Sequence, residues 1–341
     1  MFHSSFVPKD LSRLAGSQGQ SLGTRRGGSN SARGGDSFTG RVQSLEGTLV
    51  VDLTRYLPGP FASRDLLQLG ARVLRIEPPG GDPMRQTAPA WYEALNTGKE
   101  SITLDLKAEP ERARELCAEA DVVIEGMRPG VAERLGIGPA DLPGSVVYCS
   151  ITGFGLGGRH EQRAGHDLNY QGWAGLLADT APSLPPAQLA DLAAGSLTAV
   201  MQILGALLAR EKTGRGDHLV VSMTHGSHRF AAHRLGGEPI PKLLTGGLAC
   251  YRVYPTADGR HLTVAALEQK FFARLCALLS LEELTPRQYD PDAQEELTET
   301  LAETFASKPL AAWLELFDRE DVCVGPVATL EEAAADFGKA P

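Results

Sequence analysis

The stretch Thr48–Glu77 reads TLVVDLTRYLPGPFASRDLLQLGARVLRIE and decides the fold class. It opens with a short apolar run rich in β-branched residues, Thr48–Leu53, and closes with a second such run, Ala71–Glu77. Between them Pro58-Gly59-Pro60 breaks the chain, and residues 61–69 have helical spacing. Strand, helix and strand in this order predict the beginning of a parallel sheet.

The same alternation continues toward the C-terminus. Apolar strands are predicted at residues 101–106, 121–124, 145–151 and 219–223, and helices at residues 109–120 and 192–209. Strands this apolar are typical of a sheet covered by helices on both faces. The sequence therefore predicts an α/β fold, whose large domain spans residues 46–228.

Residues 229–318 predict a smaller α+β domain. A hairpin is expected between Tyr251–Tyr254 and His261–Ala265, joined through Asp258-Gly259. Predicted helices follow at residues 269–279, 293–307 and 310–317.

Residues 1–45 differ from the rest because Ser, Gly and Arg dominate them. Such a composition buries too little apolar surface to fold, so we expect a disordered leader. Arg exceeds acidic residues there, as in organellar targeting peptides, but no amphipathic face accompanies it. A cytoplasmic location is the expectation.

Composition excludes several classes of function. With 341 residues and a net charge of −9, the chain lacks the excess of Lys and Arg that general nucleic-acid binders need. The five cysteines are scattered and indicate buried thiols of a reducing compartment. Neither they nor His225, His228 and His233 have the flanking ligands of a metal site, so no metal is expected.

Two patterns have tempting interpretations that the flanking residues disfavour. The uncharged run 192–209 reaches the length of a membrane span, but its many small residues indicate a buried core helix and no membrane span. Gly153–Gly158 satisfies G-x-G-x-x-G after a strand, but no apolar helix follows to bind a pyrophosphate. A flexible glycine loop is therefore predicted.

Asp191 stands at the head of the apolar run 192–209, and a second ionisable cluster, Gly165–Tyr170, lies upstream of it. A carboxylate at this position either caps the helix or has its reactivity tuned by the helix. His166 likewise is either a hydrogen-bonded core residue or a partner of Asp191 in acid–base chemistry.

Ordered sequence blocks extend beyond these two clusters. They are VVDLTRYLPGPF (50–61), GARVLRIE (70–77), NTGKESITLDLK (96–107), DVVIEGMRPGVAERLG (121–136), SITGFG (150–155), GHDLNY (165–170), LAD (189–191), TADG (256–259) and AALE (265–268). In these blocks the chain resembles the class III CoA-transferase superfamily (CaiB/BaiF type), and within it the α-methylacyl-CoA racemases.

The resemblance implies a Rossmann-like large domain, a smaller α+β domain and an interlocked homodimer. It also implies an acyl-CoA substrate, with coenzyme A as part of the substrate and no separate cofactor. In the racemases a carboxylate matching Asp191 and a histidine matching His166 exchange the α-proton through an enolate, and a glutamate matching Glu268 orients the histidine. In the transferases the carboxylate instead forms an anhydride with the acyl group, so a CoA-transferase is the alternative.

The resemblance also maps the substrate-binding residues. The CoA strip falls on Leu104, Leu106, Lys107, Gly126, Met127, Arg128 and Arg134, with Arg75 as a further cation, and Asp167 and Tyr170 are expected at the thioester end. Cations there suit the nucleotide phosphates. Backbone amides at the start of the Asp191 helix or near Asp167 are expected to stabilise the enolate oxygen.

Relatives usually continue for several tens of residues beyond the position of Pro341. Residues 319–341 are therefore expected to return to the large domain and to be truncated, which weakens the expectation of a dimer.

Overall fold

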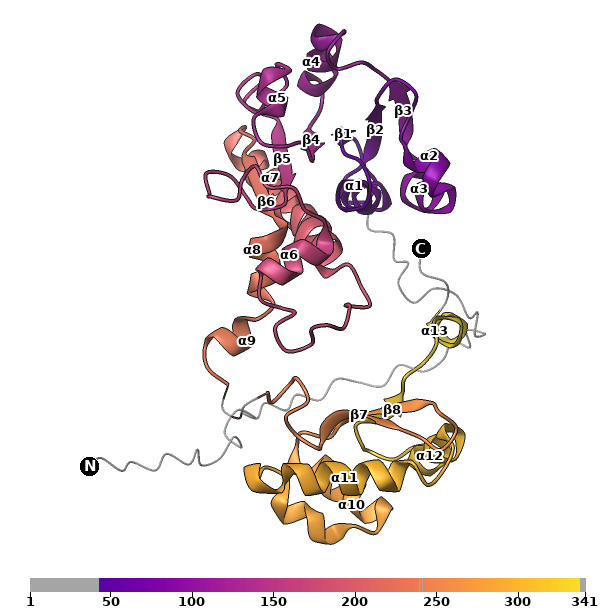
Figure 1. Ribbon diagram of the computed structural model, residues 1–341. Helices are drawn as coiled ribbons and strands as arrows, with labels where there is room; N and C mark the ends of the chain where they lie inside the picture. Colours follow the sequence, from indigo (N-terminus) through magenta and orange to yellow (C-terminus); the bar gives the residue numbers. More distant parts are fainter. Residues whose placement is uncertain (1–42, 239, 241, 338–341) are drawn as a thin grey trace, which may run out of the picture. The chain divides into compact units, whose positions relative to one another are not determined.

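The computed structural model describes residues 43–238, 240 and 242–337 (Figure 1). The leader predicted for residues 1–45, with its possible targeting role, lies outside the described residues except at its last three positions.

A six-stranded parallel sheet forms the centre of the first part of the chain, with the strand order β3-β2-β1-β4-β5-β6. The strands are β1 (Leu49–Asp52), β2 (Arg72–Glu77), β3 (Glu100–Thr103), β4 (Val122–Glu125), β5 (Val147–Thr152) and β6 (His218–Ser222). The predicted α/β fold is confirmed, and this order is that of Rossmann-like sheets.

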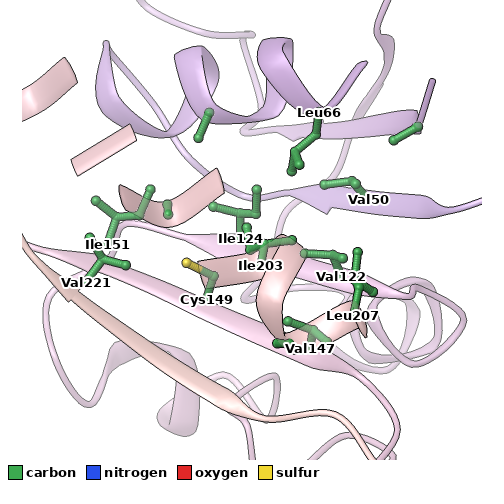
Figure 2. Packing of buried hydrophobic residues seen from close by; sticks show 14 of the residues in the cluster. Val50, Leu66, Val122, Ile124, Val147, Cys149, Ile151, Ile203, Leu207 and Val221 are labelled. Carbon is green, nitrogen blue, oxygen red and sulfur yellow. The ribbon is translucent and has the colours of Figure 1, made fainter. Parts of the chain in front are cut away.

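Helices cover both faces of this sheet. Neighbouring residues of β1 contact different helices. Val50 packs with α1 (Pro58–Gln68) and α7 (Thr198–Thr213) on one face. Val51 packs with α4 (Pro110–Ala118) and α5 (Val131–Arg134) on the other face. The first of these two cores is shown in Figure 2, where the labelled side chains are Val50, Leu66, Val122, Ile124, Val147, Cys149, Ile151, Ile203, Leu207 and Val221. Successive residues of a strand point to opposite faces of the sheet, so both sets must be buried when helices cover both faces.

Shorter helices connect these elements. They are α2 (Met84–Thr87), α3 (Pro89–Asn96), α6 (Asp167–Trp173), α8 (Met223–Arg229) and α9 (Ala232–Leu235).

The first helix corrects one prediction. Pro58-Gly59-Pro60 does not break the chain but forms the first turn of α1. Proline is tolerated there because the first amides of a helix have no partner within it. The missing side chain at Gly59 is required, since a Cβ atom would lie 2.1 Å from Thr54 Oγ1.

The long apolar helix begins in an unusual way. Residues Ala190–Leu197 form a π-helix, η2, which continues directly into α7. Its inner face is buried, as at Ala194 and Ile203, but Leu197, Met201 and Leu208 are exposed, so the predicted core helix is buried on one side only. By length and composition this segment is the one described helix that could cross a membrane, although the same is true of many core helices.

The second sheet belongs to the C-terminal part of the chain. Its antiparallel strands are β7 (Tyr251–Pro255), β8 (His261–Ala265) and β9 (Val324–Pro326). The surrounding helices are α10 (Gln269–Leu279), η3 (Glu282–Arg287), η4 (Pro291–Ala293), α11 (Gln294–Phe305), α12 (Leu310–Phe317) and α13 (Leu330–Phe337). Since β9 pairs with β8, this sheet extends past residue 318, and part of the segment predicted to return to the large domain belongs to it.

A cluster of buried charges lies at the end of β2. Arg75 is 1% exposed and forms ion pairs with Asp52 (Nη1 to Oδ2, 3.5 Å), Glu77 (Nε to Oε1, 3.4 Å) and Asp82. Burying a charge is tolerated only when partners of opposite charge replace its water shell. Removing any one of these charges would therefore leave another buried charge without its partner.

We predict that Arg75→Met lowers the free energy of unfolding by about 3–5 kcal/mol, because it leaves buried carboxylates without their counter-charge. Arg72 is a matched control, since it lies on the same strand but pairs with Glu100 in solvent. Arg72→Met is expected to cost less than about 1 kcal/mol. Urea denaturation of both variants measures the difference, and equal losses would contradict the prediction.

Candidate functional site

A pocket of about 1120 Å³ opens at the carboxyl ends of the parallel strands. The loop after β1 lines it with Leu53 and Thr54, and the loop after β4 with Gly126 and Met127. These neighbouring strands lead to opposite halves of the sheet. Ligands of open α/β sheets bind at such a topological switch point, so this pocket is the candidate site.

Most of the predicted site residues meet in this one pocket. Its lining includes His166, Asp191, Leu104, Leu106, Lys107, Gly126, Met127, Arg128 and Tyr170. The loops that supply them are far apart in sequence, and the parallel sheet is what brings them together.

His166 and Asp191 reach the pocket from two helix starts. His166 is the extended residue before α6, where its backbone N–H donates to Asn169 Oδ1 at 3.1 Å. Asp191 lies in the first turn of η2. The interpretation of Asp191 as a helix cap is wrong, because the cap position is Leu189 and no side-chain bond caps this helix.

Asp167 lies next to Asp191 but not in the pocket lining. It is buried, and its Oδ1 accepts the backbone N–H of Asp191 at 2.9 Å. The amide of Asp191 is thereby already engaged. One of the amides predicted to stabilise an enolate oxygen therefore already has a hydrogen-bond partner within the protein.

The Asp191 carboxyl has an altered acidity. Burial, and then the negative charge of Asp167, raise its pKa to about 6, while His166 acts in the opposite direction. Both effects follow from the lower solvation and like charge that disfavour a carboxylate. A carboxyl with this pKa can both accept and donate a proton near neutral pH.

Tyr170 forms one wall beside the pair. Its hydroxyl donates to the carbonyl of Gly165 at 2.5 Å, and burial, then the charge of Asp191, raise its pKa. A Cβ atom at Gly153 or at Gly165 would lie 2.6 or 2.7 Å from the Tyr170 ring. Gly153 and Gly165 are thus required for packing against Tyr170, and the next described helix after the glycine loop, α6, begins only at Asp167.

The predicted cations fall in three environments. Lys107 and Arg128 line the pocket, whereas Arg134 is exposed outside the lining. Arg75 is enclosed by three carboxylates, so its predicted contact with the nucleotide is not available. Two exposed cations that the sequence analysis missed, Arg55 and Arg163, line the pocket instead.

Glu268 begins α10 beside the second sheet, where its carbonyl accepts the backbone N–H groups of Phe271 and Phe272 at 2.9 and 3.1 Å. Its predicted contact with His166 stays a prediction. Among the described residues, no group of three His, Cys, Asp or Glu is placed to hold a metal ion.

Comparison with known proteins identifies the family. The model of "CoA-transferase family III" matches residues 45–338, nearly the whole described chain. The chain belongs to this family. The fold of this member agrees with its solved relatives, since the crystal structure of Rv3272 from M. tuberculosis superposes with a TM-score of 0.76 at 30% identity, covering 85% of this chain and 84% of that one.

Relatives of two activities match this family member about equally well. Human alpha-methylacyl-CoA racemase is 36% identical over 311 residues, covering 85% of this chain and 79% of the relative. Mouse succinyl-CoA:glutarate CoA-transferase is 33% identical over 351 residues, covering 92% of this chain and 80% of the relative. Both are enzymes that act on CoA thioesters by name, which supports an enzymatic function for this chain.

We predict that Asp191→Asn makes the protein more stable at pH 8 by on the order of 1–3 kcal/mol. The unfolded chain releases the Asp191 proton near pH 4, but the folded protein keeps it until about pH 6. Stability therefore falls as the pH rises through this window, and the amide removes that loss.

Denaturation of both proteins at pH 4 and pH 8 measures the effect. The two should differ little at pH 4, where the folded protein keeps the proton on Asp191 and the unfolded chain has released it only in part. A variant equally or less stable at pH 8 would contradict the prediction.

Proposed function

We propose that this enzyme racemises 2-methyl-branched acyl-CoA thioesters by moving the α-proton between His166 and Asp191. The observation that carries the proposal is that these two side chains line the same pocket, and that the pKa of the Asp191 carboxyl is about 6. Imidazole ordinarily titrates in the same range, so each group can serve as acid or base.

The chemistry requires two proton carriers. Removing the α-proton of a thioester leaves a planar enolate, and inversion follows only if a proton returns to the opposite face. For one epimer His166 takes the proton and protonated Asp191 supplies another; for the other epimer the roles are reversed. In each direction one proton leaves and one returns, so the reaction balances without an oxidant or a reductant.

The enolate oxygen needs hydrogen-bond donors. The Asp191 amide is bonded to Asp167, so we assign this role to backbone amides at the start of α6, next to His166. Glu268 is proposed to accept from the His166 ring, which would fix its tautomer and stabilise the imidazolium.

A CoA-transferase is the second candidate, and the similarity to transferases over most of the chain supports it. In that reaction the Asp191 carboxylate attacks the acyl-CoA carbonyl, CoA leaves as its thiolate, and a mixed anhydride results. Such a reaction uses Asp191 alone. His166 is the feature that favours the racemase.

Exchange of the α-proton tests the racemase. In D2O, both (R)- and (S)-2-methylacyl-CoA should take up deuterium at the α-carbon, as followed by NMR. His166→Ala and Asp191→Asn should each slow racemisation by at least about 100-fold, because each removes one proton carrier.

His233 and Asp217 offer matched controls, since both are exposed and lie outside the pocket lining. His233→Ala and Asp217→Asn are expected to keep normal exchange. Hydroxylamine separates the two candidates, because it intercepts an anhydride during turnover with a carboxylate acceptor and leaves a racemase active. Absence of exchange together with hydroxylamine inactivation would overturn the racemase and favour the transferase.

CoA binding is predicted to depend on the two predicted cations that line the pocket. Lys107→Ala and Arg128→Ala should each weaken binding of free CoA roughly 10-fold, the loss of one charge-assisted hydrogen bond to a phosphate. Arg112, an exposed residue of α4 paired with Glu115, is the control and should not change the affinity. Calorimetry measures the three variants, and unchanged affinity in both pocket variants would contradict the assignment.

A further inference from the structure

The helix that carries Asp191 accepts no side-chain cap of its own, but its first turn is hydrogen-bonded to a buried carboxylate of another helix. Asp167 is 8% exposed, and it contacts η2 across 24 residues of sequence. Its Oδ1 accepts the Asp191 backbone N–H at 2.9 Å, and its Oδ2 accepts Gln171 Nε2 at 2.5 Å. Both donors are neutral, and no cation forms an ion pair with Asp167 within the described ranges.

We propose that Asp167 is a positioning residue, which fixes Asp191 at the pocket wall and holds an uncompensated negative charge beside its carboxylate. The inference rests on the proposed function in taking Asp191 as the reacting group. It applies equally to proton transfer and to nucleophilic attack, because it concerns the state of Asp191 before any reaction.

The contacts around Asp167 restrict the position of the Asp191 backbone. Asp167 accepts an amide in the first turn of η2, where helix amides lack intrahelical partners. Gln171 holds the second carboxylate oxygen from the same helix, α6, and α8 packs closely on η2, where a Cβ atom at Gly226 would lie 2.8 Å from Ala194 Cβ. A shift of Asp167 would therefore move the Asp191 backbone with it.

The charge of Asp167 has a separate effect. Like charges disfavour ionisation of each other, and Asp167 is the strongest charged neighbour that raises the pKa of Asp191, after burial itself. His166 opposes it from the same helix start. Other titratable groups stand on elements packed against η2, namely Arg64 and Asp65 (α1), Tyr148 and Cys149 (β5), Tyr170 (α6), Arg210, Glu211 and Lys212 (α7), His218 (β6), and His225, His228 and Arg229 (α8).

Two substitutions of Asp167 distinguish the effect of its hydrogen bond to Asp191 from the effect of its negative charge. Asp167→Asn keeps an oxygen that accepts the Asp191 amide but removes the charge. Asp167→Ala removes both. We expect both variants to lower the pKa of Asp191 below about 6, whereas the alanine variant should in addition lose kcat, by roughly 100-fold, because the Asp191 backbone is released.

The pKa of Asp191 is measured directly in the free enzyme. The full chain is labelled with ¹³C at the aspartate carboxyl carbons, and the Asp191 signal is assigned by its loss in Asp191→Asn. Titration should show its midpoint move to lower pH in Asp167→Asn. An unchanged midpoint in a folded variant would overturn the proposal.

Asp121 supplies a matched control. Its carboxylate also accepts a backbone amide, that of Leu49 at 2.8 Å, but it lies just before β4, at the amino ends of the strands, whereas the pocket opens at their carboxyl ends. Asp121→Asn should leave the Asp191 midpoint unchanged. An equal shift in this control would show a general loosening of the fold and would also overturn the proposal.

A second measurement does not depend on changing Asp167. In the Asp191→Asn variant, the backbone amide at position 191 should exchange slowly with D2O, because its N–H is bonded to Asp167 Oδ1. An amide that exchanges as fast as an exposed one would contradict the hydrogen bond.

Activity then separates this inference from the proposed function. If the Asp191 midpoint moves but no α-proton exchange is seen in the wild-type enzyme, the racemase fails while the role of Asp167 stands. If exchange is normal and the midpoint does not move, only the role of Asp167 fails.

Discussion

Burial of both faces of the parallel sheet is the constraint on which the rest of the structure depends. A parallel strand can be joined to the next only by a crossover that passes over one face, so α1 and α7 cover one side, and α4 and α5 the other. All carboxyl ends then lie at one edge. The pocket arises there because the loops after β1 and β4 diverge at the change of winding direction.

Two carboxyl groups at this edge, those of Glu77 and Asp191, differ in what surrounds them and therefore in their pKa. Glu77 is ionised readily: burial would raise its pKa, but hydrogen bonds from Arg85, Tyr92 and the Asp82 amide lower the pKa to about 2. Among the described residues no donor bonds to the Asp191 carboxyl, and burial raises its pKa to about 6. The number of hydrogen-bond donors around a carboxyl group thus decides whether its pKa is lowered or raised at this edge of the sheet.

Much of the architecture could be predicted from local pattern. The helices at residues 269–279 and 310–317 were predicted with the bounds that α10 and α12 have, because their apolar spacing is regular and their ends are marked. The start of α1 was missed because proline breaks the interior of a helix but is accepted in its first turn. The sequence of residues 58–60 does not show which of these two positions the prolines occupy.

The motifs predict His166, Asp191, Lys107 and Arg128 as site residues, and the structure brings these four into the lining of one pocket. The contacts of other predicted residues could not be read from the motifs. Arg75 and Asp167 were assigned to the substrate, but their partners are Asp82, seven residues on, and the Asp191 amide, 24 residues on. Such pairings depend on tertiary burial, which decides whether a charged side chain faces a ligand or a counter-charge.

The π-helical start of the Asp191 helix has a consequence for how the chain tolerates length changes. A π-helix holds more residues per turn than an α-helix, so η2 accommodates surplus backbone that α7 does not. Losing one residue between Asp191 and Leu197 would let the segment rewind as an α-helix. The side chains before the deletion would then keep nearly their present orientation relative to α7, because the lost residue is the surplus one. Loss of one residue within α7 would instead rotate every side chain before it, Asp191 included, by about 100° around the axis. The first turns of this helix are therefore expected to tolerate a single deletion that α7 does not.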